Sequence, residues 1–245
     1  MRFALVFGLL GLILAVSLLR QARDAAGARW ALVAFEAYLA ACILALAVAY
    51  GLRHAGLPVE GLFAHPLWSP ALRAILLPYA VLAGLTLYLS RWFDREGLMN
   101  PVGPGLFVGR LPFPSERPRL ADAGVTAVLS LCWEFPLLPD LSKTPGLEAA
   151  CVPILDGCPP SNVQFREAVE RVGRWRAEGR TVLIHCAQGH GRSATIAAAV
   201  LCRLGVSPDV EGALTLIRTS RPRARPSRSQ REALEGFLDL PPRPH

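Results

Sequence analysis

The segment 181–200, TVLIHCAQGHGRSATIAAAV, constrains the fold of this chain more than any other stretch. It begins with apolar and β-branched residues, which predict a buried strand of the kind found in parallel sheets. Gly189 and Gly191 then mark a loop, and an alanine-rich run predicts a helix from about residue 192 to residue 204. A strand that passes through a short loop into a helix is a building unit of α/β domains.

Strand and helix patterns alternate along residues 96–245, where the composition is that of a soluble domain. Short β-rich runs occur at 105–109, 126–132, 150–155 and 181–186. Helices are expected between and after them, one capped by Ser161 and ended by Gly179, one opened near residue 207, and one over about 229–238. We therefore predict an α/β domain with a mainly parallel sheet flanked by helices.

The loop that follows Cys186 has the composition of a site for a phosphoryl group. Its glycines let successive backbone N–H groups turn inward, and the next helix points its positive end at the same place. Cysteines in such surroundings have a pKa depressed to roughly 3.5–7.5, which predicts Cys186 as a nucleophile. Arg192 offers a planar fork for two phosphate oxygens, and Ser193 can donate a hydrogen bond to the departing sulfur.

The pattern His185-Cys186-x5-Arg192-Ser193 resembles the signature loop of the protein tyrosine phosphatase superfamily, and the domain resembles its dual-specificity branch. The resemblance covers about 103–240 and includes the runs PGLFVGRLP, CVPILDGCPP and IRTSRPRARPSRSQREAL. It implies hydrolysis of phosphomonoesters through a cysteinyl-phosphate intermediate, with no metal or organic cofactor. It also implies that His185 tunes the thiolate by hydrogen bonding.

The same resemblance implies a general acid. Asp156 ends an apolar run and precedes a glycine and a proline pair, as in the mobile acid loop of the family. It would protonate the leaving oxygen and then act as general base for hydrolysis of the intermediate. A turn aspartate is the alternative interpretation, and Asp140 is a second candidate acid.

The predicted substrate-binding residues are those of the loop together with Arg192. They are Ala187, Gln188, Gly189, His190 and Gly191. Phosphoinositide phosphatases of the family often place lysines in this loop, and none occurs here. Highly phosphorylated inositol headgroups are therefore disfavoured as substrates.

The first 95 residues differ sharply from the rest and predict a membrane region. Three runs with little charge, at about 3–19, 30–52 and 74–90, are long enough to cross a bilayer. Glu36 lies inside the second run, where a structural role near the interface is favoured over a catalytic one. The predicted organisation is a membrane region over 1–95 and a phosphatase domain over 96–245.

Arginines in the short connecting segments predict the orientation. The segment after the first run and the segment after the third carry more of them than the opposite side does, at positions 20, 23, 29, 91 and 95 against 2, 53 and 73. The positive-inside rule then places the N-terminus outside and the phosphatase domain in the cytoplasm. We expect an integral protein of a bacterial inner membrane.

Charge and cysteine content exclude some classes of partner. The formal charge of +7 comes almost wholly from arginine and accompanies no nucleic-acid-binding motif. The six cysteines lack the paired spacing of a zinc site. An arginine cluster at 218, 221, 223, 225 and 228 is either a contact for anionic lipid headgroups or a solvated loop.

The expected partner is a phosphorylated protein or a phospholipid. The main interpretation is a membrane-anchored dual-specificity or tyrosine protein phosphatase. The alternatives are a phospholipid phosphatase of the phosphatidylglycerophosphate type and an inactive membrane module that only binds phosphate.

Overall fold

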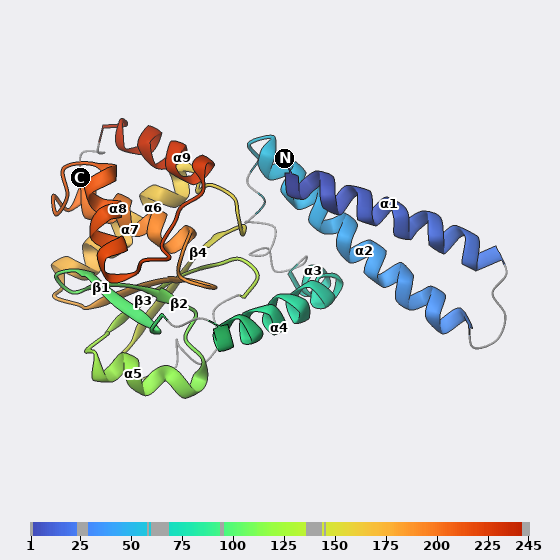
Figure 1. Ribbon diagram of the computed structural model, residues 1–245, viewed down its shortest axis with the longest axis horizontal. Helices are drawn as coiled ribbons and strands as arrows, with labels where there is room; N and C mark the ends of the chain where they lie inside the picture. Colours follow the sequence, from blue (N-terminus) through green and yellow to red (C-terminus); the bar gives the residue numbers. More distant parts are fainter. Residues whose placement is uncertain are drawn as a thin grey trace. The chain divides into compact units, whose positions relative to one another are not determined.

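The computed structural model describes residues 2–23, 29–57, 59, 69–93, 96–135, 144 and 146–241 (Figure 1). These residues form two compact units, Met1–Leu89 and Ser90–His245. The division falls close to the predicted boundary between a membrane region and a phosphatase domain.

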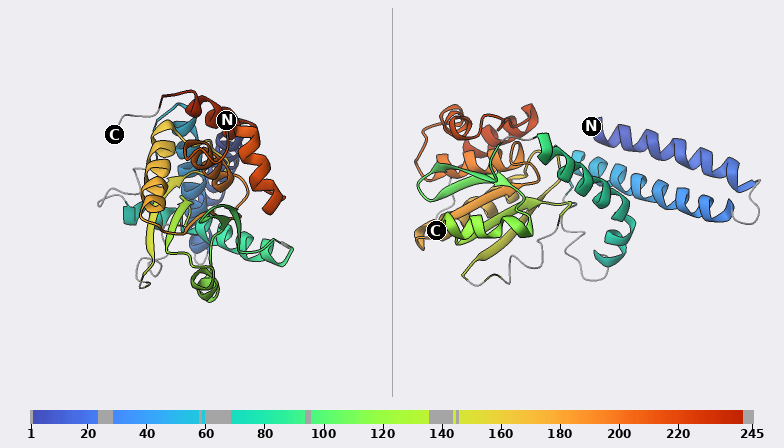
Figure 2. Two further views of the ribbon diagram at one scale, coloured as in Figure 1. Left: turned by 90° about the vertical axis from the view of Figure 1, so that its left-hand side faces the viewer. Right: turned by 60° about the horizontal axis from the view of Figure 1, so that its bottom comes forward.

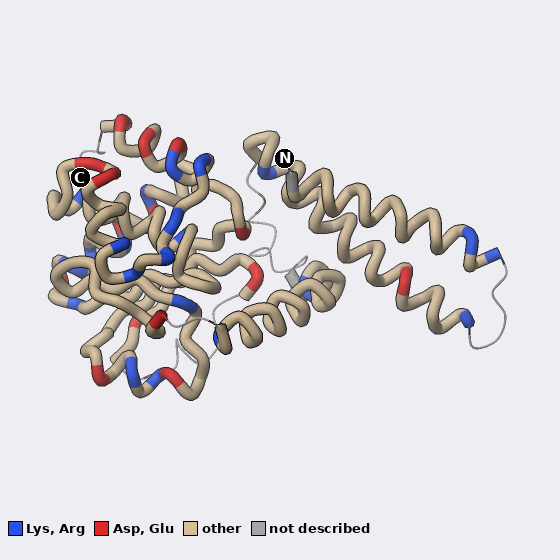
Figure 3. Tube along the Cα trace, viewed as in Figure 1, with Lys and Arg blue, Asp and Glu red and all other residues tan. Residues whose placement is uncertain are grey.

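The first unit is helical. Its elements are α1 (Arg2–Arg23), α2 (Arg29–His54), α3 (Ser69–Ile75) and α4 (Leu77–Phe93), the last of which ends in the second unit. The stretches Phe3–Arg23 and Arg29–His54 are long and apolar enough to cross a bilayer, by length and composition. Figure 3 shows how few charged residues α1 and α2 carry compared with the second unit.

Two polar contacts stabilise the helices of this unit. Gln21 donates a hydrogen bond to the Glu36 carboxylate over 2.7 Å, which gives this acidic residue in an apolar helix a partner. Pro78 has no N–H to bond with the carbonyl of Ala74, and the Tyr38 hydroxyl donates to that carbonyl instead. Both contacts support a structural role for polar groups here.

The third predicted span, at about 74–90, corresponds mainly to α4. This helix is only 17 residues long and is separated from α3 by a turn at Leu76. A helix of this length extends about 25 Å, somewhat less than the roughly 30 Å of a bilayer core. That α4 crosses the membrane stays a prediction.

The second unit is an α/β domain with a five-stranded sheet. Its elements in chain order are β1 (Met99–Gly103), β2 (Leu106–Arg110), η2 (Pro114–Glu116), α5 (Arg117–Asp122), β3 (Ala127–Cys132), β4 (Glu148–Ile154), α6 (Asn162–Ala177), β5 (Val182–Cys186), α7 (Arg192–Arg203), α8 (Val210–Ser220) and α9 (Arg228–Leu238). The strand order is β1-β2-β5-β3-β4. Among these described strands only the β1–β2 pair is antiparallel, so the prediction of a mainly parallel sheet is confirmed.

Helices cover both faces of this sheet (Figures 1 and 2). Helices α6 to α9 lie on one face over the larger apolar cluster, and α5 lies on the other over a smaller one. Side chains alternate between the faces along β5: Ile184 and Cys186 join the larger cluster, and Leu183 joins the smaller. Cys186 therefore leaves the sheet on the face where α7 begins.

Local sequence explains the main helix beside the site. Ser161 caps α6 by accepting a hydrogen bond from the Gln164 N–H, and the Gln164 side chain accepts one from the Ser161 N–H. Phe165, Val172 and Trp175 are buried in the larger cluster, and Gly179 follows the helix with φ +77°. The predicted cap and stop of this helix are confirmed.

Candidate active site

The parallel strands bring the predicted site residues to one edge of the sheet. Arg110 at the end of β2 pairs with Cys186 at the end of β5, while β3 and β4 end in the same direction. Residues that follow these strands therefore gather around the first turn of α7. This is where the loop 187–191 lies.

Cys186 is buried at the start of this loop, with 4% of its surface exposed. Its sulfur lies 3.2 Å from the Gly189 nitrogen, whose N–H donates to it, and 3.4 Å from the Ser193 hydroxyl oxygen. Gly191 is the N-cap of α7, so the helix begins directly behind the sulfur. The arrangement supplies N–H groups and a helix N-terminus to an anion beside the thiol.

Arg192 lies on the first turn of α7 and is 2% exposed. Its two terminal nitrogens donate to both oxygens of Glu134, at 2.6 and 2.8 Å, and Nη1 also donates to the Ile154 carbonyl at 2.9 Å. The buried Nε has no hydrogen-bond partner among the described residues. An unpaired donor of this kind, beside a cysteine and a helix N-terminus, fits an anionic ligand.

Glu134 is a site residue that the sequence interpretation missed. It follows β3 and its side chain is 4% exposed, and it forms a two-pronged ion pair with Arg192. The available signal was its place: an acidic residue directly after a buried strand of a parallel sheet lies at the edge where such sheets carry their sites.

Asp156 is also close to the loop. One of its carboxylate oxygens lies 3.0 Å from Nη2 of Arg192, although 63% of its side chain is exposed. It follows β4, and the next residue, Gly157, has φ +70°, a conformation that favours glycine. The structure thus places Asp156 beside Arg192 and the loop, and its role as general acid stays a prediction. Asp140, the second candidate, lies outside the described residues.

His185 is fully buried on the opposite face of β5 from Cys186. Its Nδ1 lies 3.4 Å from the Cys186 carbonyl oxygen. The pKa of His185 is lowered to about 4, mainly by burial. The hydrogen bond to the Cys186 carbonyl raises this pKa in part, and the charge of Arg192 lowers it. The ring is therefore neutral near pH 7, so it contributes hydrogen bonding and packing without charge.

The remaining loop residues form the turn between β5 and α7. Gly189 has φ +81° and lies so close to its neighbours that a Cβ would meet the Gly109 carbonyl oxygen at 2.5 Å. The ring of His190 is held by the Glu96 carboxylate, with 2.8 Å between Nε2 and Oε2. The side chain of His190 therefore lies on the outer side of the loop, in contact with Glu96.

Two other cysteines, Cys132 and Cys151, lie on the neighbouring strands β3 and β4. Burial raises the pKa of Cys151 to about 11, and it raises the pKa of Cys132 well above its ordinary value. Both are therefore protonated thiols near pH 7. Among the described residues, no three His, Cys, Asp or Glu side chains are grouped closely enough to hold a metal ion.

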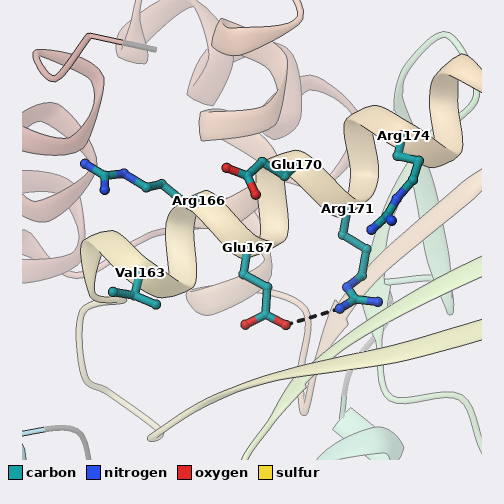
Figure 4. Close-up of a pocket in the computed structure, with 6 residues that line it drawn as sticks. All are labelled: Val163, Arg166, Glu167, Glu170, Arg171 and Arg174. Atoms are coloured by element: carbon teal, nitrogen blue, oxygen red, sulfur yellow. Dashed lines mark hydrogen bonds and ion pairs between the residues drawn. The ribbon is translucent and has the colours of Figure 1, made fainter. Parts of the chain in front are cut away.

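A separate hollow of about 300 Å³ lies along the outer side of α6 (Figure 4). Its lining consists of Val163, Arg166, Glu167, Glu170, Arg171 and Arg174. Glu167 and Arg171 form an ion pair across one turn, at 3.3 Å. Ion pairs of this kind between side chains one turn apart are typical of a solvated helix face. None of the predicted catalytic residues lines this hollow.

Comparison with curated proteins finds phosphatases of two kinds. The chain is 32% identical over 155 residues to phosphatidylglycerophosphate phosphatase PTPMT1 of Arabidopsis thaliana, covering 61% of this chain and 43% of that protein. It is 34% identical over 126 residues to dual specificity protein phosphatase 12 of Mus musculus, covering 51% and 36%. The chain thus spans roughly two fifths of the length of these relatives.

Solved structures give the same picture of the fold. The structure of Tk-PTP in the active form matches with a TM-score of 0.54 and 29% identity, covering 58% of this chain and 97% of that one. The structure of PTPMT1 in complex with PI(5)P matches with a TM-score of 0.54 and 25% identity, covering 58% and 96%.

A family profile matches slightly more than half of the chain. Its description is "Swiss Army Knife protein, DSP-PTPase phosphatase domain", and the match runs over residues 111–235. That range contains the strand that ends at Cys186, the loop, α7, Glu134 and Asp156. The chain belongs to this family of cysteine-dependent phosphatases with the dual-specificity and protein tyrosine phosphatase fold.

Proposed function

We propose that this chain is a membrane-anchored phosphatase that hydrolyses a phospholipid phosphomonoester of the phosphatidylglycerophosphate type. The observation that carries the proposal is the union, in one chain, of the Cys186–Arg192 site with the two long apolar helices α1 and α2. A helix anchor confines the enzyme to the surface where a lipid substrate is also confined. The match to a phosphatidylglycerophosphate phosphatase supports the same substrate class.

The proposed reaction begins when the Cys186 thiolate attacks the phosphorus atom. The N–H groups of the loop and the unpaired Nε of Arg192 stabilise the charge on the equatorial oxygens. As the bond from phosphorus to the glycerol oxygen breaks, Asp156 transfers its proton to that oxygen. The alcohol departs and a cysteinyl-phosphate remains on the enzyme.

Water completes the cycle. Asp156, now a carboxylate, removes a proton from a water molecule that attacks phosphorus. The bond between phosphorus and sulfur breaks, the sulfur leaves as a thiolate, and inorganic phosphate is released. The Ser193 hydroxyl, 3.4 Å from the sulfur, stabilises the thiolate that forms. Backbone N–H groups and Arg192 carry the electrostatic stabilisation in both steps.

The second candidate function is that of a dual-specificity or tyrosine protein phosphatase. The match to dual specificity protein phosphatase 12 favours it. The substrate, in that case, is a phosphorylated protein close to the membrane. The third alternative, an inactive phosphate-binding module, is disfavoured because nucleophile, arginine, hydroxyl and carboxylate all meet at one loop.

We further propose that α1, α2 and α4 anchor the enzyme in a bacterial inner membrane with the catalytic unit in the cytoplasm. The arginines that flank these helices support this orientation. Reducing conditions in the cytoplasm would also keep Cys186 in its thiol or thiolate form.

The deciding experiment compares two substrates with the full chain in detergent micelles. Phosphate release is measured from phosphatidylglycerophosphate in mixed micelles and from a phosphotyrosine peptide, with Cys186→Ser as the inactive control. A kcat/KM for the lipid far above that for the peptide supports the proposal. The reverse preference establishes the second candidate, and no release from either by a folded chain contradicts both.

A further inference from the structure

All four carbonyl groups of the loop between residues 187 and 190 are held from its outer side. Each accepts a hydrogen bond from a segment distant in sequence: Ala187 from the Leu111 N–H at 3.2 Å, Gln188 from Nη2 of Arg221 at 2.9 Å, Gly189 from Nε of Arg221 at 2.8 Å, and His190 from the Arg225 N–H at 3.0 Å. Arg221 donates to both of the two central carbonyls. The segment 221–225 therefore supports most of the loop.

Because the peptide group is planar, hydrogen bonds to carbonyls on the outer side of the loop also fix the direction of N–H groups on its inner side. In a trans peptide the C=O of one residue and the N–H of the next point in opposite directions. Arg221 fixes the Gln188 carbonyl outward, so the Gly189 N–H points inward, and it lies 3.2 Å from the Cys186 sulfur. The bond from Arg221 to the Gly189 carbonyl directs the His190 N–H inward in the same way.

Arg221 is itself fixed in place. It is fully buried, and its Nη1 donates to the Asn100 side chain at 2.9 Å and to the Gly97 carbonyl at 3.1 Å. Its Nε lies 3.4 Å from a carboxylate oxygen of Glu96. A buried guanidinium needs such a counter-ion, and with these bonds it has little freedom to turn away from the loop.

Glu96 joins three parts of the catalytic unit. Its Oε2 atom lies near Nε of Arg221 and within hydrogen-bond distance of the His190 ring. Its Oε1 atom accepts a hydrogen bond from the Arg223 N–H at 2.7 Å. Its side chain is 12% exposed. Glu96 follows closely after the end of α4 at Phe93, so the chain that enters the catalytic unit also supports the loop.

We infer that Arg221, with Glu96 as its counter-ion, is a positioning residue that holds the N–H groups of the phosphate-binding loop toward the substrate. This inference rests on the proposed function. It assigns Arg221 and Glu96 the role of holding the loop, without direct contact to the substrate. Without Arg221, the peptides after Gln188 and Gly189 are free to rotate. The N–H groups of the loop are then no longer directed at the phosphoryl oxygens or at the Cys186 sulfur.

The test uses the full chain in detergent micelles and the variants Arg221→Lys, Arg221→Met and Glu96→Gln. Controls are Arg171→Met and Glu167→Gln, because these partners form an ion pair on the solvated outer face of α6. Measurements are kcat and KM for an aryl phosphate, inhibition by orthovanadate, the rate at which iodoacetamide alkylates Cys186, and the melting temperature.

We expect Arg221→Met to lower kcat and orthovanadate affinity on the order of 100-fold, the scale of losing oriented oxyanion donors. Arg221→Lys and Glu96→Gln should lose about 10-fold, since each keeps part of the network. The rate at which iodoacetamide alkylates Cys186 should change together with kcat. A role limited to stability of the fold would change the melting temperature without changing this rate. Both control variants should behave as the wild type.

Folded variants with wild-type kcat, orthovanadate affinity and alkylation rate would overturn the inference. If Arg221→Met does not fold, the milder Arg221→Lys and Glu96→Gln decide by the same criteria. A wild-type chain that neither releases phosphate nor binds orthovanadate would instead contradict the proposed function. The two failures are thus distinguishable in one set of measurements.

Discussion

Replacing Glu134 by glutamine tests how Arg192 is held. Both oxygens of Glu134 accept hydrogen bonds from Arg192, and the two side chains are 4% and 2% exposed. Glutamine at this position would keep one acceptor, but it would turn an NH₂ group toward the guanidinium and remove the negative charge that forms two bonds with it. The change therefore affects both the stability of the fold and the geometry of the site.

The magnitude follows from the burial of the pair. Breaking a buried ion pair by removing one partner costs about 3–5 kcal/mol because the other charge stays buried. Glutamine retains one hydrogen bond, and Asp156 lies 3.0 Å from Arg192, so we expect the lower end, about 3 kcal/mol of unfolding free energy. Because a misplacement of about 1 Å can reduce rates on the order of 100-fold, kcat/KM should fall by that factor.

The assays are urea denaturation of the full chain in micelles, followed by tryptophan fluorescence, and hydrolysis of an aryl phosphate. Trp175 is buried in the core of the catalytic unit and reports on its unfolding. Glu170→Gln, on the outer side of α6, is the matched control and should change neither quantity. A folded Glu134→Gln variant with the stability and kcat/KM of this control would refute the reasoning.

Three other perturbations test the acid, the buried histidine and the third apolar run. Asp156→Asn should lower kcat by about 10²- to 10⁴-fold for an alkyl phosphate but much less for a nitrophenyl phosphate, whose leaving group needs no proton; equal losses for the two substrates would contradict its role as acid. Because the pKa of His185 is lowered to about 4 in the folded chain, the unfolded chain binds a proton at this residue between pH 6.5 and pH 4 that the folded chain does not. Stability should therefore be independent of this group above pH 6.5 and fall by about 3 kcal/mol as the pH is lowered to 4, an effect that denaturation of a folded His185→Asn variant should lack. If α4 crosses the membrane as a third span, reporters fused to the two ends of the chain should lie on opposite sides, whereas reporters on the same side would show that only α1 and α2 span.

Local sequence was sufficient to predict the part of the site that is local in the chain. The strand, loop and helix around Cys186 follow from consecutive residues, since each step depends on neighbours a few positions away. Ser193 and the helix N-terminus reach the sulfur for the same reason. The family resemblance then supplied Asp156, which the structure places beside Arg192.

Residues that act through distant contacts could not be predicted in this way. Arg221 was expected in an arginine cluster at a lipid surface or in a solvated loop, yet it is fully buried and contacts the loop 187–191. Its sequence neighbours, arginines and prolines, are those of an exposed loop. Only the fold, which brings β1 and the segment after α8 to the back of the loop, reveals the difference.

The membrane region shows a similar limit. Hydropathy located the apolar runs, because apolar length is a property of the sequence itself. It did not show that Pro78 interrupts the last run, or that Tyr38 would donate to the carbonyl left without a partner. The signal was present, since a proline inside an apolar helix pattern removes one hydrogen bond of the helix.

Arg192 relates substrate binding to placement of the acid. In the free site Glu134 and Asp156 both pair with its Nη2, but the Glu134 side chain is 4% exposed and the Asp156 side chain is 63% exposed. A phosphoryl group that binds Nε needs the adjacent Nη2 hydrogen for its second oxygen, because the guanidinium fork presents these two donors side by side. The exposed Asp156 is the partner that can move away, while the buried Glu134 stays. In the proposed reaction, arrival of the phosphate therefore releases the Asp156 carboxyl from Arg192 and frees it to face the leaving oxygen.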